Sequence, residues 1–135
     1  MKIKTVFDTN VWISFFIKGK FTELACMVLD HEVEFYRAKE LTKELIEVLG
    51  RPKIKKYLGC PISEYVSFYE NLSRFVAIKP EFNGCRDPKD NYLFDLAYQS
   101  NSKYLVSGDR DVRETPINKP LEVVSLTRFK EVIRS

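Results

Sequence analysis

Short runs of apolar residues alternate along this chain with longer amphipathic segments, and the alternation predicts strands separated by helices. Each predicted strand ends at a polar or turn-forming residue. Strands are predicted at residues 2–7, 33–36, 75–78, 104–107 and 122–125. Apolar residues spaced three or four apart predict helices at residues 21–30, 39–50, 63–73 and 88–101, with a short last helix after residue 125.

This order of elements indicates βα units, and therefore a mainly parallel sheet with helices on both faces. In such sheets, ligands bind outside the carboxyl ends of the strands. The residues that directly follow each strand are therefore the first place to look for chemistry. A length of 135 residues without internal repeats predicts one domain over residues 1–135.

The composition narrows the class of protein. Hydrophobic residues make up 44% of the chain and charged residues 30%, which is typical of a globular domain with a core of its own. No apolar run approaches the roughly 20 residues that a membrane-spanning helix needs. The acid Asp8 comes too early for a secretory signal peptide. These features predict a cytoplasmic protein without a membrane segment.

The cysteines and the single histidine exclude several kinds of site. Cys26, Cys60 and Cys85 are odd in number and far apart, which argues against a disulfide framework or a zinc site. With His31 as the only histidine and no Gly-x-Ser-x-Gly motif, a hydrolase with a Ser-His-Asp triad is also disfavoured. Any catalytic centre is therefore expected to consist of other residue types.

Two acids directly follow predicted strands. Asp8 comes after the first strand, and Asp109 follows the fourth strand through Gly108, which allows the backbone to turn sharply. Both acids are therefore predicted at the same edge of the sheet. Each has a structural alternative: Asp8 or Asn10 can cap the following helix, and Gly108-Asp109 is also a common turn.

Helical geometry singles out Glu44 among the glutamates of the predicted helix 39–50. Its apolar residues at 41, 45, 48 and 49 form one stripe, and Glu44 lies roughly 85° from the centre of that stripe. Glu40 and Glu47 lie roughly 125° and 145° away and are expected to face solvent. Glu44 is thus placed at the border of the buried face, although an ordinary boundary glutamate would have the same position.

Asp90 falls within the apolar stripe of the predicted helix 88–101. It precedes the apolar residues of that helix by three, four and seven positions, so its side chain is expected on the buried face. A buried charge must be paired or bound to a cation, because its removal from water is unfavourable. The alternative is a role at the helix N-terminus, where Asp87, followed by Pro88, is itself a typical N-cap. Asp95 points away from the stripe and is expected to be exposed.

Acids gathered at one edge of a sheet repel one another by about 1 kcal/mol or more per pair. A hard divalent cation removes this repulsion, and an oxygen-only ligand set without His or Cys favours Mg²⁺ or Mn²⁺. Such a site can polarise a phosphoryl oxygen, activate water and stabilise a leaving oxygen. The pattern therefore predicts phosphodiester hydrolysis by a site built from Asp8, Glu44, Asp90 and Asp109.

Four segments together resemble the motifs of the PIN domain family, most closely those of small VapC-like toxins of toxin–antitoxin pairs. They occur in the family's order and cover nearly the whole chain. The segments are residues 8–10, 41–53 around Glu44, 85–90 and 105–111.

The resemblance implies a three-layer α/β/α sandwich with a five-stranded, mainly parallel sheet, and Mg²⁺- or Mn²⁺-dependent ribonuclease activity on RNA. It implies catalytic metal ligands at Asp8, Glu44, Asp90 and Asp109, and a further metal ligand at Asp111. Which of Asp109 and Asp111 is the main ligand stays open, because the spacing after this strand varies among relatives. Supporting roles are implied for Asn10, Ser107 and Asp87, with Asn10 orienting Asp8.

Basic residues near these motifs are candidates for holding the RNA backbone. Solvated surface charge is the alternative, since a formal net charge of +3 does not identify a partner. The resemblance also implies a homodimer and a cognate antitoxin protein. The run 12–16 and the predicted helical segment 65–72 are candidate dimer contacts. The candidate RNA-binding residues are Lys53, Lys55, Arg86 and Arg110.

Two other functions fit parts of the pattern. A non-catalytic PIN-like module would bind RNA or a protein without cutting, but the full set of acids argues against it. A phosphoacceptor receiver is also a small parallel α/β domain with acids at the carboxyl edge. It would need a lysine after the last strand, where this chain has Leu126 and Thr127.

Overall fold

The computed structural model describes residues 1–134 and arranges them around a five-stranded sheet. The strand order is β3-β2-β1-β4-β5, and every pairing is parallel. The predicted parallel α/β sheet is confirmed, and all the carboxyl ends lie at one edge. The strands are β1 (Ile3–Phe7), β2 (Val33–Arg37), β3 (Ser73–Phe75), β4 (Tyr104–Val106) and β5 (Glu122–Val124).

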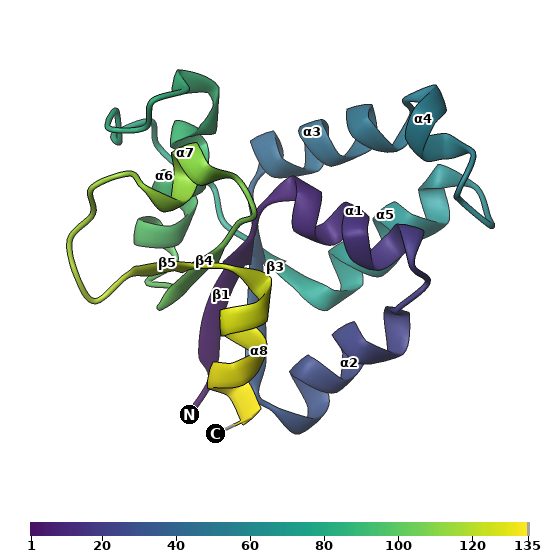
Figure 1. Cartoon of the computed structure of the whole chain (residues 1–135), viewed down its shortest axis with the longest axis horizontal. Helices are drawn as coiled ribbons and strands as arrows, with labels where there is room; N and C mark the ends of the chain where they lie inside the picture. The colour runs from purple at the N-terminus through teal and green to yellow at the C-terminus, as the bar shows by residue number, and fades with distance from the viewer. Residues whose placement is uncertain (135) are drawn as a thin grey trace.

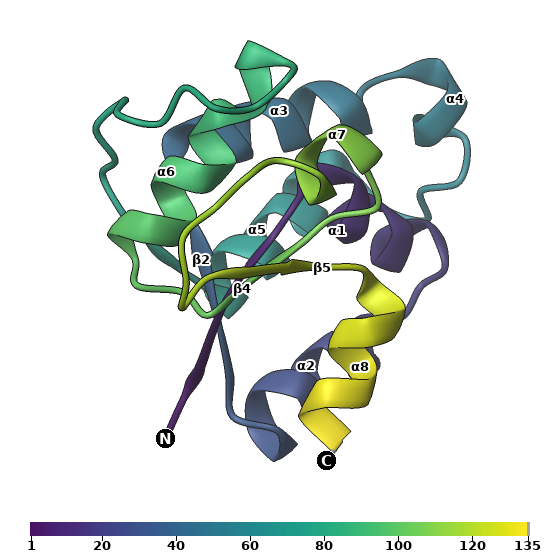
Figure 2. The ribbon, with the colours of Figure 1, turned by 60° about the vertical axis from the view of Figure 1, so that its left-hand side comes forward.

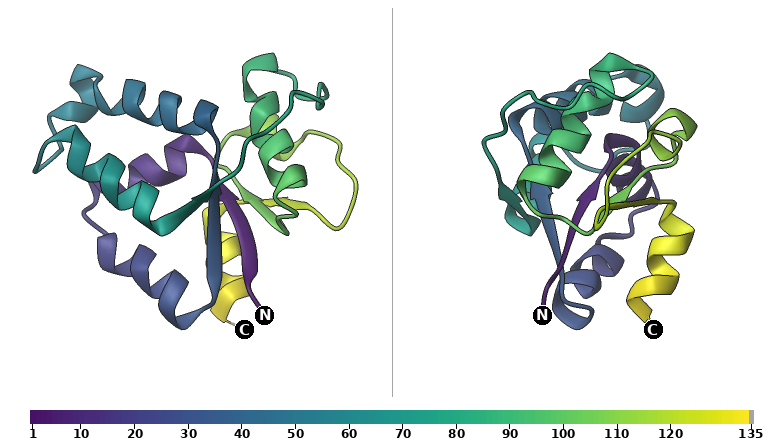
Figure 3. Two further views of the ribbon diagram at one scale, coloured as in Figure 1. Left: turned by 180° about the vertical axis from the view of Figure 1, so that it is seen from behind. Right: turned by 90° about the vertical axis from the view of Figure 1, so that its left-hand side faces the viewer.

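Helices connect the strands and cover both faces of the sheet (Figure 1). In Figure 3, α1, α2 and α5 lie on one side of β1 and β2, and α6 lies on the other, which is the expected three-layer arrangement. The helices are α1 (Thr9–Ile17), α2 (Phe21–Asp30), α3 (Lys39–Leu49), α4 (Pro52–Lys55), α5 (Ile62–Leu72), α6 (Asn91–Gln99), α7 (Arg110–Arg113) and α8 (Leu126–Arg134), with a 3₁₀ turn η1 (Pro88–Asp90) before α6. Over residues 1–134, no helix is both long enough and apolar enough to cross a membrane.

Aromatic rings fill the core between the sheet and α1. Phe7 of β1 contacts Trp12, Phe15, Phe35 and Phe129, with ring centroids between 4.6 and 6.0 Å apart. Buried aromatic pairs of this kind contribute about 0.5–1.5 kcal/mol each beyond the area that they bury. The core therefore anchors β1 at the residue that immediately precedes Asp8.

The run 12–16 was wrong as a candidate dimer contact, because it lies inside this core. Trp12 is fully buried and Phe16 is 1% exposed. The sequence pattern predicted no helix here, since α1 is apolar on nearly every side and lacks the polar face that marks an amphipathic helix. In the other candidate, residues 65–72, Tyr65 and Tyr69 are also buried.

Two further predictions need correction. The third strand spans Ser73–Phe75 instead of 75–78, because its parallel partner β2 ends at Arg37, the residue that pairs with Phe75. Asp95 is buried instead of exposed, since its Oδ1 accepts the N–H groups of Glu81 at 3.0 Å and Phe82 at 2.8 Å. A long connection before α6 covers this side of the helix, which periodicity alone does not show.

Candidate active site

Acids from four separate segments line one cavity of about 390 Å³ at the carboxyl edge of the sheet. Asp8 follows β1, Glu44 lies in α3, Asp90 ends η1, and Asp109 follows β4. Figure 2 shows α6 and α7, the helices that begin beside Asp90 and Asp109, on the near side of the molecule. The structure thus brings together the four acids that the sequence pattern singled out.

Asp8 is buried and held by hydrogen bonds. Its backbone N–H donates to the carbonyl of Val106 at 2.9 Å, and Ser107 Oγ donates to its Oδ2 at 2.7 Å. Burial raises the pKa of Asp8, the Ser107 hydrogen bond opposes this, and the charge of Glu44 raises the pKa further. The Asp8 side chain forms no capping hydrogen bond to α1, so the structure does not support the capping alternative.

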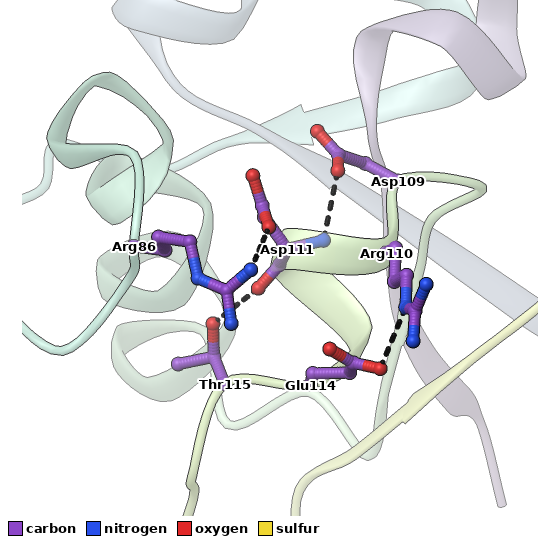
Figure 4. A network of polar contacts seen from close by, with 6 residues as sticks. All are labelled: Arg86, Asp109, Arg110, Asp111, Glu114 and Thr115. Carbon is purple, nitrogen blue, oxygen red and sulfur yellow. Dashed lines mark hydrogen bonds and ion pairs between the residues drawn. The ribbon is translucent and has the colours of Figure 1, made fainter.

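Ser107 connects the two acids that follow β1 and β4. Its hydroxyl donates to Asp8 and also accepts the backbone N–H of Asp109 at 3.0 Å. Asp109 in turn accepts the N–H of Asp111 through Oδ1 at 2.9 Å, as an N-cap of α7 (Figure 4). Asp109 therefore combines the predicted turn role with a place in the acid cavity.

Asp111 lies outside the lining of the acid cavity. Its Oδ1 lies 3.1 Å from Arg86 Nη1, and the two residues line a different, smaller cavity (Figure 4). Among the two acids left open by the sequence, Asp109 is the one that lines the cavity with Asp8. Asn10 also lines this cavity, but within residues 1–134 no hydrogen bond joins it to Asp8.

Two hydroxyl groups hold Glu44. Thr9 and Tyr92 both donate to its Oε1, Tyr92 at 3.1 Å. Burial, and then the charge of Glu44, raises the pKa of Tyr92 well above its ordinary value, so this phenol stays protonated and remains a donor. Sequence reasoning missed both donors, although Thr9 directly follows Asp8 and Tyr92 lies two residues after Asp90.

Asp90 is only 9% exposed, as its place in the apolar stripe predicted. Its side chain caps no helix, whereas Asp87 Oδ1 accepts the N–H of Lys89 at 3.2 Å and caps η1. Burial, together with the nearby charges of Asp8 and Asp87, raises the pKa of Asp90 to about 6. The helix-capping alternative therefore applies to Asp87 and not to Asp90.

Comparison with known proteins agrees with this arrangement. Residues 4–111 match the sequence model of the PIN domain. The chain belongs to the PIN domain family. It is also 32% identical over 119 residues to the uncharacterized protein MJ1680 of Methanocaldococcus jannaschii, an alignment that covers 83% of this chain and 74% of the relative. PIN domains are generally nucleases and usually depend on a metal ion.

The donor atoms of this PIN domain suit a hard cation. The acid cavity is lined by carboxylate oxygens and by no histidine or cysteine, which favours Mg²⁺ or Mn²⁺ over zinc. Over residues 1–134, no three Asp, Glu, His or Cys side chains already converge closely enough to hold one ion. Mutual repulsion of the carboxylates favours this separation. The chemistry of the ligand set fits a divalent cation, even though the acids stand apart.

Two cations border the acid cavity of the PIN domain, and neither was among the predicted RNA-binding residues. They are Arg51, which lies 3.0 Å from Glu47, and Lys89. The four predicted cations lie outside the cavity lining: two are exposed on α4, and two form surface ion pairs with Asp111 and Glu114 (Figure 4). These four are Lys53, Lys55, Arg86 and Arg110.

Proposed function

We propose that this PIN domain is an endoribonuclease that hydrolyses RNA phosphodiester bonds in the cytoplasm with the help of Mg²⁺ or Mn²⁺. The observation that carries the proposal is the burial of Asp8 and Asp90 in one acid-lined cavity. Within residues 1–134 neither carboxylate forms an ion pair. Buried carboxylates without an oppositely charged partner are unfavourable, so these two acids are best explained as ligands of a cation.

Asp8, Glu44, Asp90 and Asp109 are the proposed ligands. A divalent cation bound there would polarise the phosphoryl group, activate a water molecule and stabilise the leaving oxygen. Ser107 keeps Asp8 in place, and the hydroxyls of Thr9 and Tyr92 keep Glu44 in place. These donors restrict the Asp8 and Glu44 side chains before the substrate arrives, which lowers the cost of ordering them. Asp111 would join the ligands only after leaving Arg86.

Cations around the cavity are proposed to hold the RNA backbone. Arg51 and Lys89 lie nearest, at the cavity wall. Arg51 pairs with Glu47 in an exposed ion pair, and such pairs are worth at most about 1 kcal/mol, so a phosphate can replace the glutamate. The more distant candidates would extend this contact along the RNA strand. They are Lys53, Lys55, Arg86 and Arg110.

We expect the purified protein to cleave single-stranded RNA in Mn²⁺ or Mg²⁺ and to stop when EDTA is added. Gel electrophoresis of a labelled circular RNA measures this directly, because an exonuclease has no end from which to start. Undiminished cleavage in EDTA would reject the metal-dependent mechanism. RNA binding without cleavage under any of these cations would support the non-catalytic module instead.

The toxin role, a cognate antitoxin and a homodimer complete the proposal, and the motif resemblance supports them. We expect light scattering at micromolar concentration to return twice the monomer mass. Expression in a bacterial host should arrest growth, and the Asp8→Asn variant should relieve the arrest. A monomer mass would contradict the dimer, and equal growth with both proteins would contradict the toxin role.

A further inference from the structure

A second cavity, of about 450 Å³, opens on the other flank of α3, between this helix and the edge strand β3. We call it the α3–β3 groove. Its lining includes Arg37 at the end of β2, Lys39, Lys43 and Ile46 of α3, Glu70 of α5, and Phe75 at the end of β3. The acid cavity is lined by Glu44 and Glu47 of the same helix, so α3 forms a wall of both cavities.

Two apolar side chains of the α3–β3 groove are open to solvent. Phe75 is 57% exposed and Ile46 is 45% exposed. The many ring contacts of this protein involve other aromatic residues, and within residues 1–134 no other ring packs against Phe75. An aromatic face that is free in this way is a surface on which a flat apolar group can stack.

The charges around the α3–β3 groove are mainly positive, with three cations against Glu70. Arg37 already donates from Nη1 to the backbone carbonyls of Glu70, at 2.9 Å, and Ser73. Lys39 and Lys43 form no ion pair or hydrogen bond through their side chains with any residue of 1–134. Unpaired ammonium groups beside an exposed ring complement a ligand that is both flat and anionic.

We propose that the α3–β3 groove binds nucleotides of single-stranded RNA, with a base stacked on Phe75 and phosphates beside Lys39 and Lys43. A nucleotide combines the flat apolar surface and the negative charge that these residues complement. The groove and the acid cavity share α3 and lie at the same edge of the sheet, so one RNA strand can cross this helix and occupy both. Binding of RNA in the groove does not depend on whether the protein cleaves it. Only the inference that the bound nucleotides flank the cleaved bond rests on the proposed nuclease function.

Fluorescence anisotropy in EDTA at low salt tests the groove without cleavage. The probes are a short labelled oligouridylate and an abasic ribose-phosphate oligomer of the same length. Phe75→Ala should weaken binding of the oligouridylate by about 5-fold or more and leave the abasic probe unaffected, because only the former can stack. Lys43→Ala should weaken the binding of both probes. The slope of log affinity against log salt concentration should be smaller in magnitude by about 0.7 than in the unmodified protein.

Leu29→Ala and Lys2→Ala are matched controls, since they remove an exposed apolar and an exposed cationic side chain near the amino ends of β2 and β1. Neither should change RNA affinity.

Unchanged affinity in Phe75→Ala and Lys43→Ala overturns the groove proposal, even if metal-dependent cleavage is found. Weakened binding in a protein that cleaves no RNA with Mn²⁺ supports the groove and rejects the nuclease. Phe75→Ala could instead keep its RNA affinity and shift from dimer to monomer mass in light scattering. That result would show that the groove is a contact between two copies of the chain, and the proposal would be wrong.

Discussion

Asp8→Asn should lower the rate of RNA cleavage in Mn²⁺ by at least about 100-fold, the range seen when one stabilising group of a catalytic site is removed. An amide is neutral and binds hard cations more weakly than a carboxylate does. The substitution keeps the shape of the side chain, and its carbonyl oxygen can still accept the hydrogen bond from Ser107. The fold should therefore survive, which circular dichroism checks. Cleavage at the unmodified rate would contradict a site centred on Asp8.

Residues that position the acids should matter less than the acids themselves. Tyr92→Phe removes one of the two donors to Glu44 Oε1 and should lower kcat by about 10-fold, with little change in KM for RNA. Tyr98→Phe is the matched control on the same helix, because its hydroxyl accepts the N–H of Asn118 at 3.0 Å and does not line the acid cavity. Equal losses in the two variants would indicate a general effect of the missing hydroxyl on α6.

Asp90→Asn should melt at a higher temperature than the unmodified protein when both are kept in EDTA. Burial and the neighbouring carboxylates raise the pKa of Asp90 to about 6, so near neutral pH the folded state holds this charge at a free-energy penalty. The neutral amide removes the penalty, and the cap on η1 comes from Asp87 and is unaffected. A gain of about 1 kcal/mol corresponds to roughly 2–6 °C in a domain of this size.

The same pKa shift gives the pH dependence of this gain. Between the ordinary pKa of 3.8 and the folded-state value of about 6, the folded protein binds more protons at Asp90 than the unfolded chain does. The contribution of Asp90 to stability therefore rises as the pH falls through this window, and the penalty is complete above about pH 6. The advantage of Asp90→Asn in EDTA should be largest above that pH and shrink as the pH approaches about 4.

Mn²⁺ should reverse the order of the two proteins. It stabilises the folded state by binding to it, and the unmodified protein offers one more charged ligand than Asp90→Asn does. Differential scanning fluorimetry with and without Mn²⁺ compares them. If Asp90→Asn is the less stable protein in EDTA and neither protein responds to Mn²⁺, Asp90 serves the helix and the four-acid site is wrong.

Local sequence features were sufficient for the parallel sheet and for the grouping of the acids. Asp8 and Asp109 directly follow apolar strands, and the helical positions of Glu44 and Asp90 can be read from neighbouring residues. Parallel strands place their carboxyl ends together, so the four acids were predicted to meet.

Features that depend on distant partners could not be predicted in this way. Glu44 receives hydrogen bonds from residues 35 and 48 positions away, and no local pattern marks Thr9 or Tyr92 as its donors. The end of β3 is set by its register with β2. Asp95 is buried by a connection that has no periodicity of its own.

The hydroxyl shared between the ends of β1 and β4 has a consequence for how this protein can change during evolution. Phe7 pairs with Val106 in adjacent strands, so Asp8 and Ser107 emerge side by side, and Ser107 also holds the backbone of Asp109. The separation of Asp8 and Asp109 is therefore set by backbone pairing in the middle of the sheet. Insertions in the peripheral connections, such as residues 76–87, can lengthen the chain without altering that separation. Surfaces that choose the substrate can thus diversify while this part of the acid site keeps its geometry.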